Sequence, residues 1–190
     1  MKANIFKYPD FDKFNTFPKL LKHRSEIMPD EVALRNKDLG IWNEITWDEY
    51  NKIVSELSIG LKSIGFKQGD VLALIGDNKP EWVFFEIACH ANGGMSLGVY
   101  RDTLDDEVGY LVKSAKVKFA YAEDQEQVDK LINVQKKLKT KMKVIYDDPR
   151  GLEKLKNPNV INMKDLASEG KKQLDKNYKL YENLINKLKL

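Results

Sequence analysis

The sequence predicts an α/β fold in which a parallel sheet is flanked by helices, in the order strand–helix–strand–helix–strand–helix–strand. Short continuous apolar runs, such as residues 71–75, are typical of strands buried on both faces. Amphipathic helical patterns separate these runs, as expected when helices connect parallel strands. The 190 residues are 42% hydrophobic and 32% charged, which excludes a disordered chain and allows a sizeable core.

An aromatic arm and a β-hairpin are expected to precede the sheet. The arm takes up residues 1–30 and should pack on the body, because a free arm would expose much apolar area. Its aromatic residues are Phe6, Tyr8, Phe11, Phe14 and Phe17. Pro18 in a first turn predicts a short helix over residues 17–24. Strand candidates at 32–35 and 41–45, with a turn over 36–40 between them, predict the hairpin.

The first long helix begins at a capping box, in which Thr46 is followed three residues later by Glu49. Apolar residues then recur at helical spacing until Gly65, a typical helix stop. The next helix should begin around Pro80, with Glu81 completing a cap, and the one after it should be capped by Thr103. The expected strands are 71–75, 95–100, 119–122 and 144–146, and the helices between them are 80–91, 104–112 and 125–138.

Three segments divide the chain. Residues 1–30 form the arm, residues 31–150 form the α/β subdomain, and residues 151–190 form a lysine-rich, mostly helical extension. The extension contains a strand-like patch at 160–163 and helical patterns at 165–174 and 178–190. Because the last pattern stops without a capping residue, the extension is expected to be incomplete.

Composition and charge narrow the class of partner. Residues 126–190 carry 16 basic and 9 acidic side chains, but the whole chain has only four arginines, which argues against nucleic-acid binding. A basic tail of this kind allows peripheral contact with acidic lipids. The longest stretch without a charge, residues 87–100, is too short to span a bilayer as a helix. A single cysteine and no signal-peptide pattern predict a cytoplasmic protein.

Two motifs suggest chemistry that their context does not support. The glycines in residues 92–98 resemble a phosphate loop, but they follow a helix and precede a strand, which is the reverse of the order that phosphate binding requires. We interpret them as a helix stop and a tight turn. Cys89 and His90 are adjacent on one helix and point about 100° apart, so they are expected to be core fillers rather than a nucleophile and its base.

The ends of the predicted strands carry polar residues where ligands bind to open parallel sheets. The candidate binding residues there are Asp77, Asn78, Tyr100, Arg101 and Thr103, and the pairs Glu123–Asp124 and Asp147–Asp148 fall on the same edge. Helix capping is the alternative role for the Asp, Asn and Thr side chains. Arg101 fits capping less well. No catalytic residue and no metal ligand is predicted.

Several blocks, in this order, resemble the N-terminal region of AMP-forming acyl-CoA synthetases, and of long-chain fatty-acid–CoA ligases in particular. The resemblance covers residues 17–165. The blocks that carry it are residues 46–50, 76–82, 91–100, 103–111, 122–130 and 145–152.

The resemblance implies a partial N-terminal subdomain of the adenylate-forming fold. The intact family enzyme would use ATP, Mg²⁺ and coenzyme A to convert a fatty acid to its acyl-CoA through an acyl-adenylate. The Ser/Thr/Gly-rich loop ending in Pro-Lys-Gly that contacts ATP in the family does not occur in this sequence, nor does the catalytic lysine in its context. The chain alone is therefore expected to bind no cofactor and to be inactive. Its expected partner is the missing C-terminal part of the ligase or a second copy of itself. The alternative is a stand-alone flavodoxin-like binding or dimerisation module.

Overall fold

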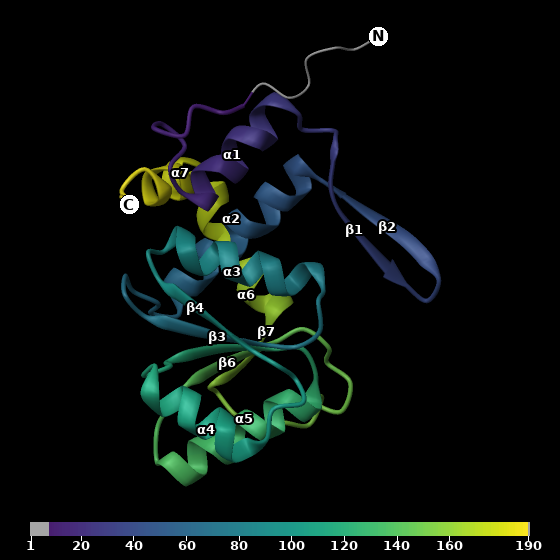
Figure 1. Cartoon of the computed structure of the whole chain (residues 1–190), viewed down its shortest axis with the longest axis vertical. Coiled ribbons are helices and arrows are strands. Elements are labelled where there is room, and N and C mark those ends of the chain that lie inside the picture. The colour runs from purple at the N-terminus through teal and green to yellow at the C-terminus, as the bar shows by residue number, and fades with distance from the viewer. Residues whose placement is uncertain (1–7, 190) are drawn as a thin grey trace.

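The computed structural model describes residues 8–189, and its centre is a five-stranded parallel sheet (Figure 1). The four expected strands are confirmed, except that the second ends at Val99 and not at Tyr100. The strand-like patch in the lysine-rich extension forms a fifth strand that pairs with the fourth. In spatial order the strands are β4 (Met95–Val99), β3 (Val71–Ile75), β5 (Phe119–Ala122), β6 (Lys143–Tyr146) and β7 (Val160–Asn162).

Helices cover both faces of the sheet (Figure 1). α2 (Trp47–Ser63), α3 (Pro80–Ala91) and α6 (Met163–Lys176) lie on one face, and α4 (Asp105–Ser114) and α5 (Gln125–Leu138) lie on the other. α1 (Phe17–Ile27) and α7 (Lys179–Ile185) pack outside α2. The two layers of helices follow from right-handed crossovers. From β3 to β4 the chain moves towards one edge of the sheet, and from β4 to β5 and on to β6 it moves towards the opposite edge. The helices in these two sets of connections therefore lie on opposite faces.

Alternate residues of the central strand serve two separate cores. Leu72 and Leu74 pack with α2 and α3, whereas Ala73 and Ile75 pack with α4 and α5. Every residue of β3 is buried, which explains why the strand reads as one apolar run without alternation.

Helix starts were only partly predictable. The capping box is confirmed, since Thr46 Oγ1 accepts the Glu49 N–H at 3.2 Å and the Glu49 carboxylate accepts the Thr46 N–H at 2.9 Å. Thr103 is not the cap of α4, because the helix begins one residue later and the Leu104 N–H donates to the Glu107 carboxylate at 3.3 Å. The residue before α3 is a lysine without a side-chain cap, and Glu81 lies in the first turn of that helix.

The predicted hairpin is present as β1 (Val32–Asp38) and β2 (Ile41–Thr46), and it projects from the body of the molecule (Figure 1). Its turn is shorter than expected, because Asp38 pairs with Ile41 and leaves a two-residue loop. Leu39 and Gly40 both have positive φ, at 46° and 84°. This pattern is typical of a type I′ turn, in which asparagine or glycine would be less strained than leucine.

The lysine-rich extension packs on the body through α6 and α7. The helices differ from the expected bounds, since α6 covers Met163–Lys176 and α7 ends at Ile185. α6 crosses α2 at two glycines, Gly60 and Gly170, where a Cβ on Gly170 would lie 1.9 Å from the Glu56 carbonyl oxygen. Glycine therefore allows direct backbone contact between the two helices.

The aromatic arm packs less completely than predicted. Phe14 stacks on His23 with 3.9 Å between the ring centroids, as expected of a docked arm. Tyr8, Phe11 and Phe17 are exposed, so for these three the expectation is wrong. Phe6 lies outside the described residues.

Candidate functional site at the carboxyl edge of the sheet

The strand order creates one position where a ligand would be expected. After β3 the chain turns to the face covered by α3, and after the adjacent β5 it turns to the face covered by α5. Neighbouring loops that diverge in this way leave a crevice outside the carboxyl ends of the strands. The order β4-β3-β5-β6-β7 is the same as that of flavodoxin-like folds, in which this switch point binds the cofactor.

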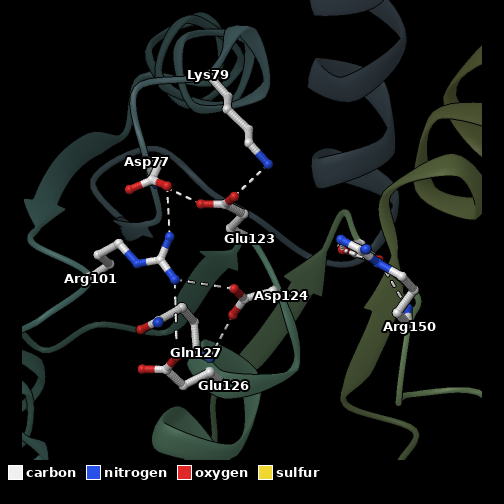
Figure 2. Close-up of polar contacts among 9 residues, drawn as sticks. Asp77, Lys79, Arg101, Glu123, Asp124, Glu126, Gln127 and Arg150 are labelled. Carbon is white, nitrogen blue, oxygen red and sulfur yellow. Dashed lines mark hydrogen bonds and ion pairs between the residues drawn. The ribbon is translucent and has the colours of Figure 1, made fainter. Parts of the chain in front are cut away.

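A cluster of charged side chains fills this position (Figure 2). Glu123, at the end of β5, is its centre. One carboxylate oxygen accepts the Asp77 backbone N–H at 2.6 Å, and the other pairs with the Lys79 ammonium. We call Asp77, Lys79, Arg101, Glu123 and Asp124 the edge cluster.

Arg101 connects the ends of three strands. Its guanidinium donates to the Asp77 carboxylate at 2.6 Å and lies 3.6 Å from Asp124 and 4.0 Å from Glu126 (Figure 2). Its backbone carbonyl accepts a hydrogen bond from the Lys130 ammonium at 2.5 Å. The hydrogen bond and charge of Asp77 raise the pKa of Arg101 further above its ordinary value. Arg101 therefore fastens the loop after β4 to the loops after β3 and β5.

Glu123 fills the crevice beside the loop between β3 and α3. Its carboxylate holds this loop through the Asp77 N–H and the Lys79 ammonium. Gly76 makes the approach possible, since a Cβ on this residue would lie 2.8 Å from the Glu123 Cβ and 3.0 Å from its carboxylate. The switch point is thus closed by the protein's own carboxylate.

The cluster has more negative than positive charge in its surroundings. Burial would lower the pKa of Lys79, but the hydrogen bond and charge of Glu123, with further acidic neighbours, raise it above its ordinary value. Burial raises the pKa of both Glu81 and Asp147. The charge of Asp147 adds to the effect on Glu81, and the charges of Asp148 and Glu123 add to the effect on Asp147. One oxygen of Glu81 is buried with no hydrogen-bond partner among residues 8–189. The surroundings of Glu81 and Asp147 therefore favour protonation of these carboxylates and disfavour the binding of an anion.

The structure brings together two of the five candidate residues, Asp77 and Arg101. Asn78 and Tyr100 are exposed at the same edge, and the Thr103 N–H donates to the Tyr100 carbonyl at 3.1 Å. Among the alternatives, capping is confirmed for Asp124, whose carboxylate accepts the Gln127 N–H at 3.1 Å at the start of α5.

Sequence reasoning missed Lys79 and the central position of Glu123. The loops after β3 and β5 belong to neighbouring strands, and that adjacency is not visible in the sequence. The sequence did contain one signal for Lys79, since this lysine comes directly before Pro80, the expected first residue of a helix. A further ion pair, between Asp148 and Arg150, lies apart from the cluster beyond β6 (Figure 2). The hydrogen bond from Arg150 lowers the pKa of Asp148 to about 2.

A serine and a histidine meet away from this edge without forming a catalytic triad. His90 Nε2 lies 3.1 Å from Ser96 Oγ, while Ser96 Oγ donates to the Glu86 carboxylate at 3.4 Å. A triad needs the acid on the far nitrogen of the ring, but Glu86 contacts the serine. Burial lowers the pKa of His90 and raises that of Cys89 to about 12. Cys89 is fully buried, so its interpretation as a core filler is confirmed.

The glycines after α3 have the structural role predicted for them. Gly93 has a φ of 69°, which permits the turn, and a Cβ on Gly94 would lie 2.5 Å from Phe66 and 2.8 Å from Cys89 Sγ. The segment runs from α3 directly into β4 and packs on the core. It therefore forms a turn and not a phosphate cradle.

The described part of the chain holds neither a cluster of metal-binding side chains nor a helix able to cross a membrane. Among residues 8–189, no three His, Cys, Asp or Glu side chains are grouped so that they could hold a metal ion. None of the helices in that range combines the length and the apolar character needed to cross a membrane.

Comparison with known proteins identifies similar sequences and folds. The family model for AMP-binding enzymes matches residues 21–177. The long-chain-fatty-acid–CoA ligase ACSBG1 of Homo sapiens is 27% identical over 121 residues, which cover 63% of this chain and 17% of the human protein. The Bos taurus ACSBG1 is 25% identical over 142 residues, 74% of this chain and 19% of that protein. The chain thus spans less than a fifth of these relatives.

Solved structures show the same fold. A putative long-chain-fatty-acid CoA ligase from Rhodopseudomonas palustris superposes with a TM-score of 0.67 and 21% identity, covering 81% of this chain and 36% of that one. A luciferase-like enzyme from the mealworm Zophobas morio gives a TM-score of 0.70 with 16% identity, covering 85% and 35%.

Proposed function

Because the chain belongs to the AMP-binding enzyme family, we propose that it forms the N-terminal part of a long-chain fatty-acid–CoA ligase. Such a ligase joins a fatty acid to coenzyme A, and ATP is cleaved to AMP and pyrophosphate through an acyl-adenylate. The observation that carries the proposal is the match of residues 21–177, whose curated relatives are named as ligases of this class. A cytoplasmic location with peripheral membrane contact is part of the same proposal.

ATP, Mg²⁺ and coenzyme A would belong to the complete enzyme, because the edge cluster does not fit a triphosphate. Its two cations, Lys79 and Arg101, are already paired with carboxylates. Glu123 already occupies the Asp77 N–H, and the carboxyl groups of Glu81 and Asp147 lie nearby. A polyphosphate would be repelled at this position, so we derive no catalytic step from it.

We infer that these residues act as a scaffold within the ligase and that the chain alone is inactive. The edge cluster ties the loops after β3, β4 and β5 to one another and leaves no nucleophile beside a base. The partner required for activity would be the remaining part of the ligase, with the ATP loop and the catalytic lysine. A stand-alone flavodoxin-like module is the alternative, but its usual binding crevice is filled here by Glu123.

The test is a pyrophosphate-release assay with ATP, Mg²⁺, oleate and coenzyme A. We expect no release above the buffer rate from the 190-residue chain alone. The assay is then repeated with the product of any reading frame that follows the gene and encodes a Pro-Lys-Gly loop, and we expect oleate-dependent release from the mixture. Omitting oleate is the matched control. Turnover by the chain alone would refute its proposed inactivity, and a mixture without turnover would refute the ligase assignment.

A further inference from the structure

The edge of the sheet opposite to the edge cluster carries a concentration of lysines. Because the five strands are parallel, the loops that enter them all lie at this amino edge (Figure 1). Three segments, residues 62–70, 113–118 and 136–143, lead from the ends of α2, α4 and α5 into β3, β5 and β6. Together they contain ten lysines and one acidic residue, Asp70, although the whole chain has a net charge of only +3. The amino edge is therefore strongly basic, whereas the rest of the chain is acidic on balance.

Hydrogen bonds bring these lysines into one patch. The buried Asp70 carboxylate accepts the Lys67 N–H at 2.9 Å and pairs with the Lys118 ammonium at 2.6 Å. The Lys118 carbonyl accepts the Lys143 N–H at 3.0 Å, and Lys141 lies two positions before Lys143 in the same loop. The amino-edge patch consists of five exposed lysines, Lys67, Lys116, Lys118, Lys139 and Lys141. Asp70 pairs with one of their ammonium groups, so the patch keeps a large positive charge.

Two lysines of the patch have backbone conformations that favour glycine. Lys116 and Lys139 have φ of 53° and 51°, and each lies within two residues of the end of a helix. Glycine usually occupies such positions, because a Cβ is strained in the left-handed region. Both side chains are exposed, so packing in the core does not explain the choice of lysine. Strain that is kept at an exposed position points to a function for the side chain.

The patch fits an anionic lipid surface better than a nucleic acid. Nucleic-acid interfaces use arginine for bidentate contacts and aromatic rings for stacking on bases. All four arginines of the chain lie outside the three lysine-rich segments, and the only aromatic residue in these segments, Phe66, is buried. Lysine attracts anions as a point charge, without the fixed geometry of a guanidinium. Clusters of about four to eight basic residues are typical of surfaces that meet acidic lipid headgroups.

We propose that the amino-edge patch binds the anionic headgroups of a phospholipid membrane. The proposal rests on the peripheral membrane contact that is part of the proposed function, and it assigns that contact to a surface. In this orientation the amino ends of β3, β5 and β6 face the lipid, and the edge cluster at the carboxyl ends faces away from it. The carboxyl edge then stays accessible to the rest of the ligase.

Cosedimentation of the full chain with vesicles tests the proposal. We expect binding to phosphatidylcholine vesicles that contain phosphatidylserine, and none to vesicles of phosphatidylcholine alone. Raising the salt from about 0.1 M to about 1 M should abolish binding, because the screening length falls from roughly 10 Å to 3 Å.

A pair of matched double variants locates the binding surface. Lys116→Gln with Lys139→Gln should weaken vesicle binding roughly 25-fold, because each lysine near an acidic leaflet contributes about fivefold. Lys176→Gln with Lys179→Gln removes the same charge from exposed lysines at the junction of α6 and α7, outside α2. This control should bind as the wild type does. Equal losses in the two double variants would overturn the proposal, because binding would then follow net charge and not the patch.

Glycine substitutions separate binding from stability. Lys116→Gly with Lys139→Gly should weaken vesicle binding as much as the glutamine pair does, yet raise the Tm measured by circular dichroism, because glycine relieves the positive φ. A fall in both binding and Tm would refute the role assigned to the strained lysines.

Two outcomes with the wild type would also overturn the proposal. One is the absence of binding to phosphatidylserine vesicles at low salt. The other is tighter binding to a single-stranded DNA oligonucleotide than to the vesicles, which would assign the patch to nucleic acid. The ligase assignment would stand in either case, because pyrophosphate release is measured without vesicles.

Discussion

Replacing Gly170 by alanine should destabilise this protein, although alanine is the better helix former. In an exposed helix the change stabilises by about 1 kcal/mol. Gly170 is buried where α6 crosses α2, and an added Cβ would lie 1.9 Å from the Glu56 carbonyl oxygen and 2.9 Å from the Gly60 nitrogen. Both atoms belong to the backbone of α2, so no side chain can rotate out of the way.

The magnitude follows from the displacement that the methyl group requires. Ordinary contact begins near 3.4 Å, so α6 would have to move away from α2 by roughly 1 Å or more, and Leu166 would lose part of its packing. Overpacking of this severity costs about 3 kcal/mol. After the gain in helix propensity, we expect a net loss of about 2 kcal/mol, or roughly 4–8 °C in Tm for a chain of this size.

Urea unfolding followed by circular dichroism measures the effect, with Gly109→Ala as the matched control. Gly109 also lies inside a helix, but a Cβ there would meet only Val134, at 4.0 Å. The control should therefore gain about 1 kcal/mol. If Gly170→Ala were as stable as the wild type while Gly109→Ala gained stability, the close crossing of α2 and α6 would be wrong.

Three further predictions concern the edge cluster and the hairpin. Glu123→Ala should cost about 1–2 kcal/mol, because it leaves the Asp77 N–H without its acceptor. Phosphate should raise the Tm of this variant more than that of the wild type, because it can take the place of the carboxylate between this N–H and Lys79, and an equal response would refute this reasoning. Burial raises the pKa of Glu81, so the wild type loses stability as the pH rises through that pKa. Glu81→Gln should therefore be more stable than the wild type at pH 7 but not at pH 4, and denaturant titrations at both values would show a constant difference if this reasoning fails. Leu39→Asn should stabilise the hairpin by about 0.5–1 kcal/mol by relieving its positive φ, which thermal unfolding would detect.

Local interactions explain which elements could be predicted from the sequence. The α2 capping box joins residues three positions apart, and the apolar run of β3 records burial on both faces, so both are visible in a short window. The turn of the hairpin was placed less well, because leucine does not ordinarily adopt the positive φ found at Leu39.

Contacts between distant residues were decided by the tertiary structure alone. Glu123 reaches the Asp77 N–H only because β5 lies beside β3, and the sequence does not give this strand order. Gly170 looks like a weak point in a lysine-rich helix until α6 is placed against α2. The sequence by itself determined most of the helices and strands, since these depend on short-range pattern. The tertiary structure decided which charges pair and which glycines are required, because each of these depends on residues brought together from far apart in the chain.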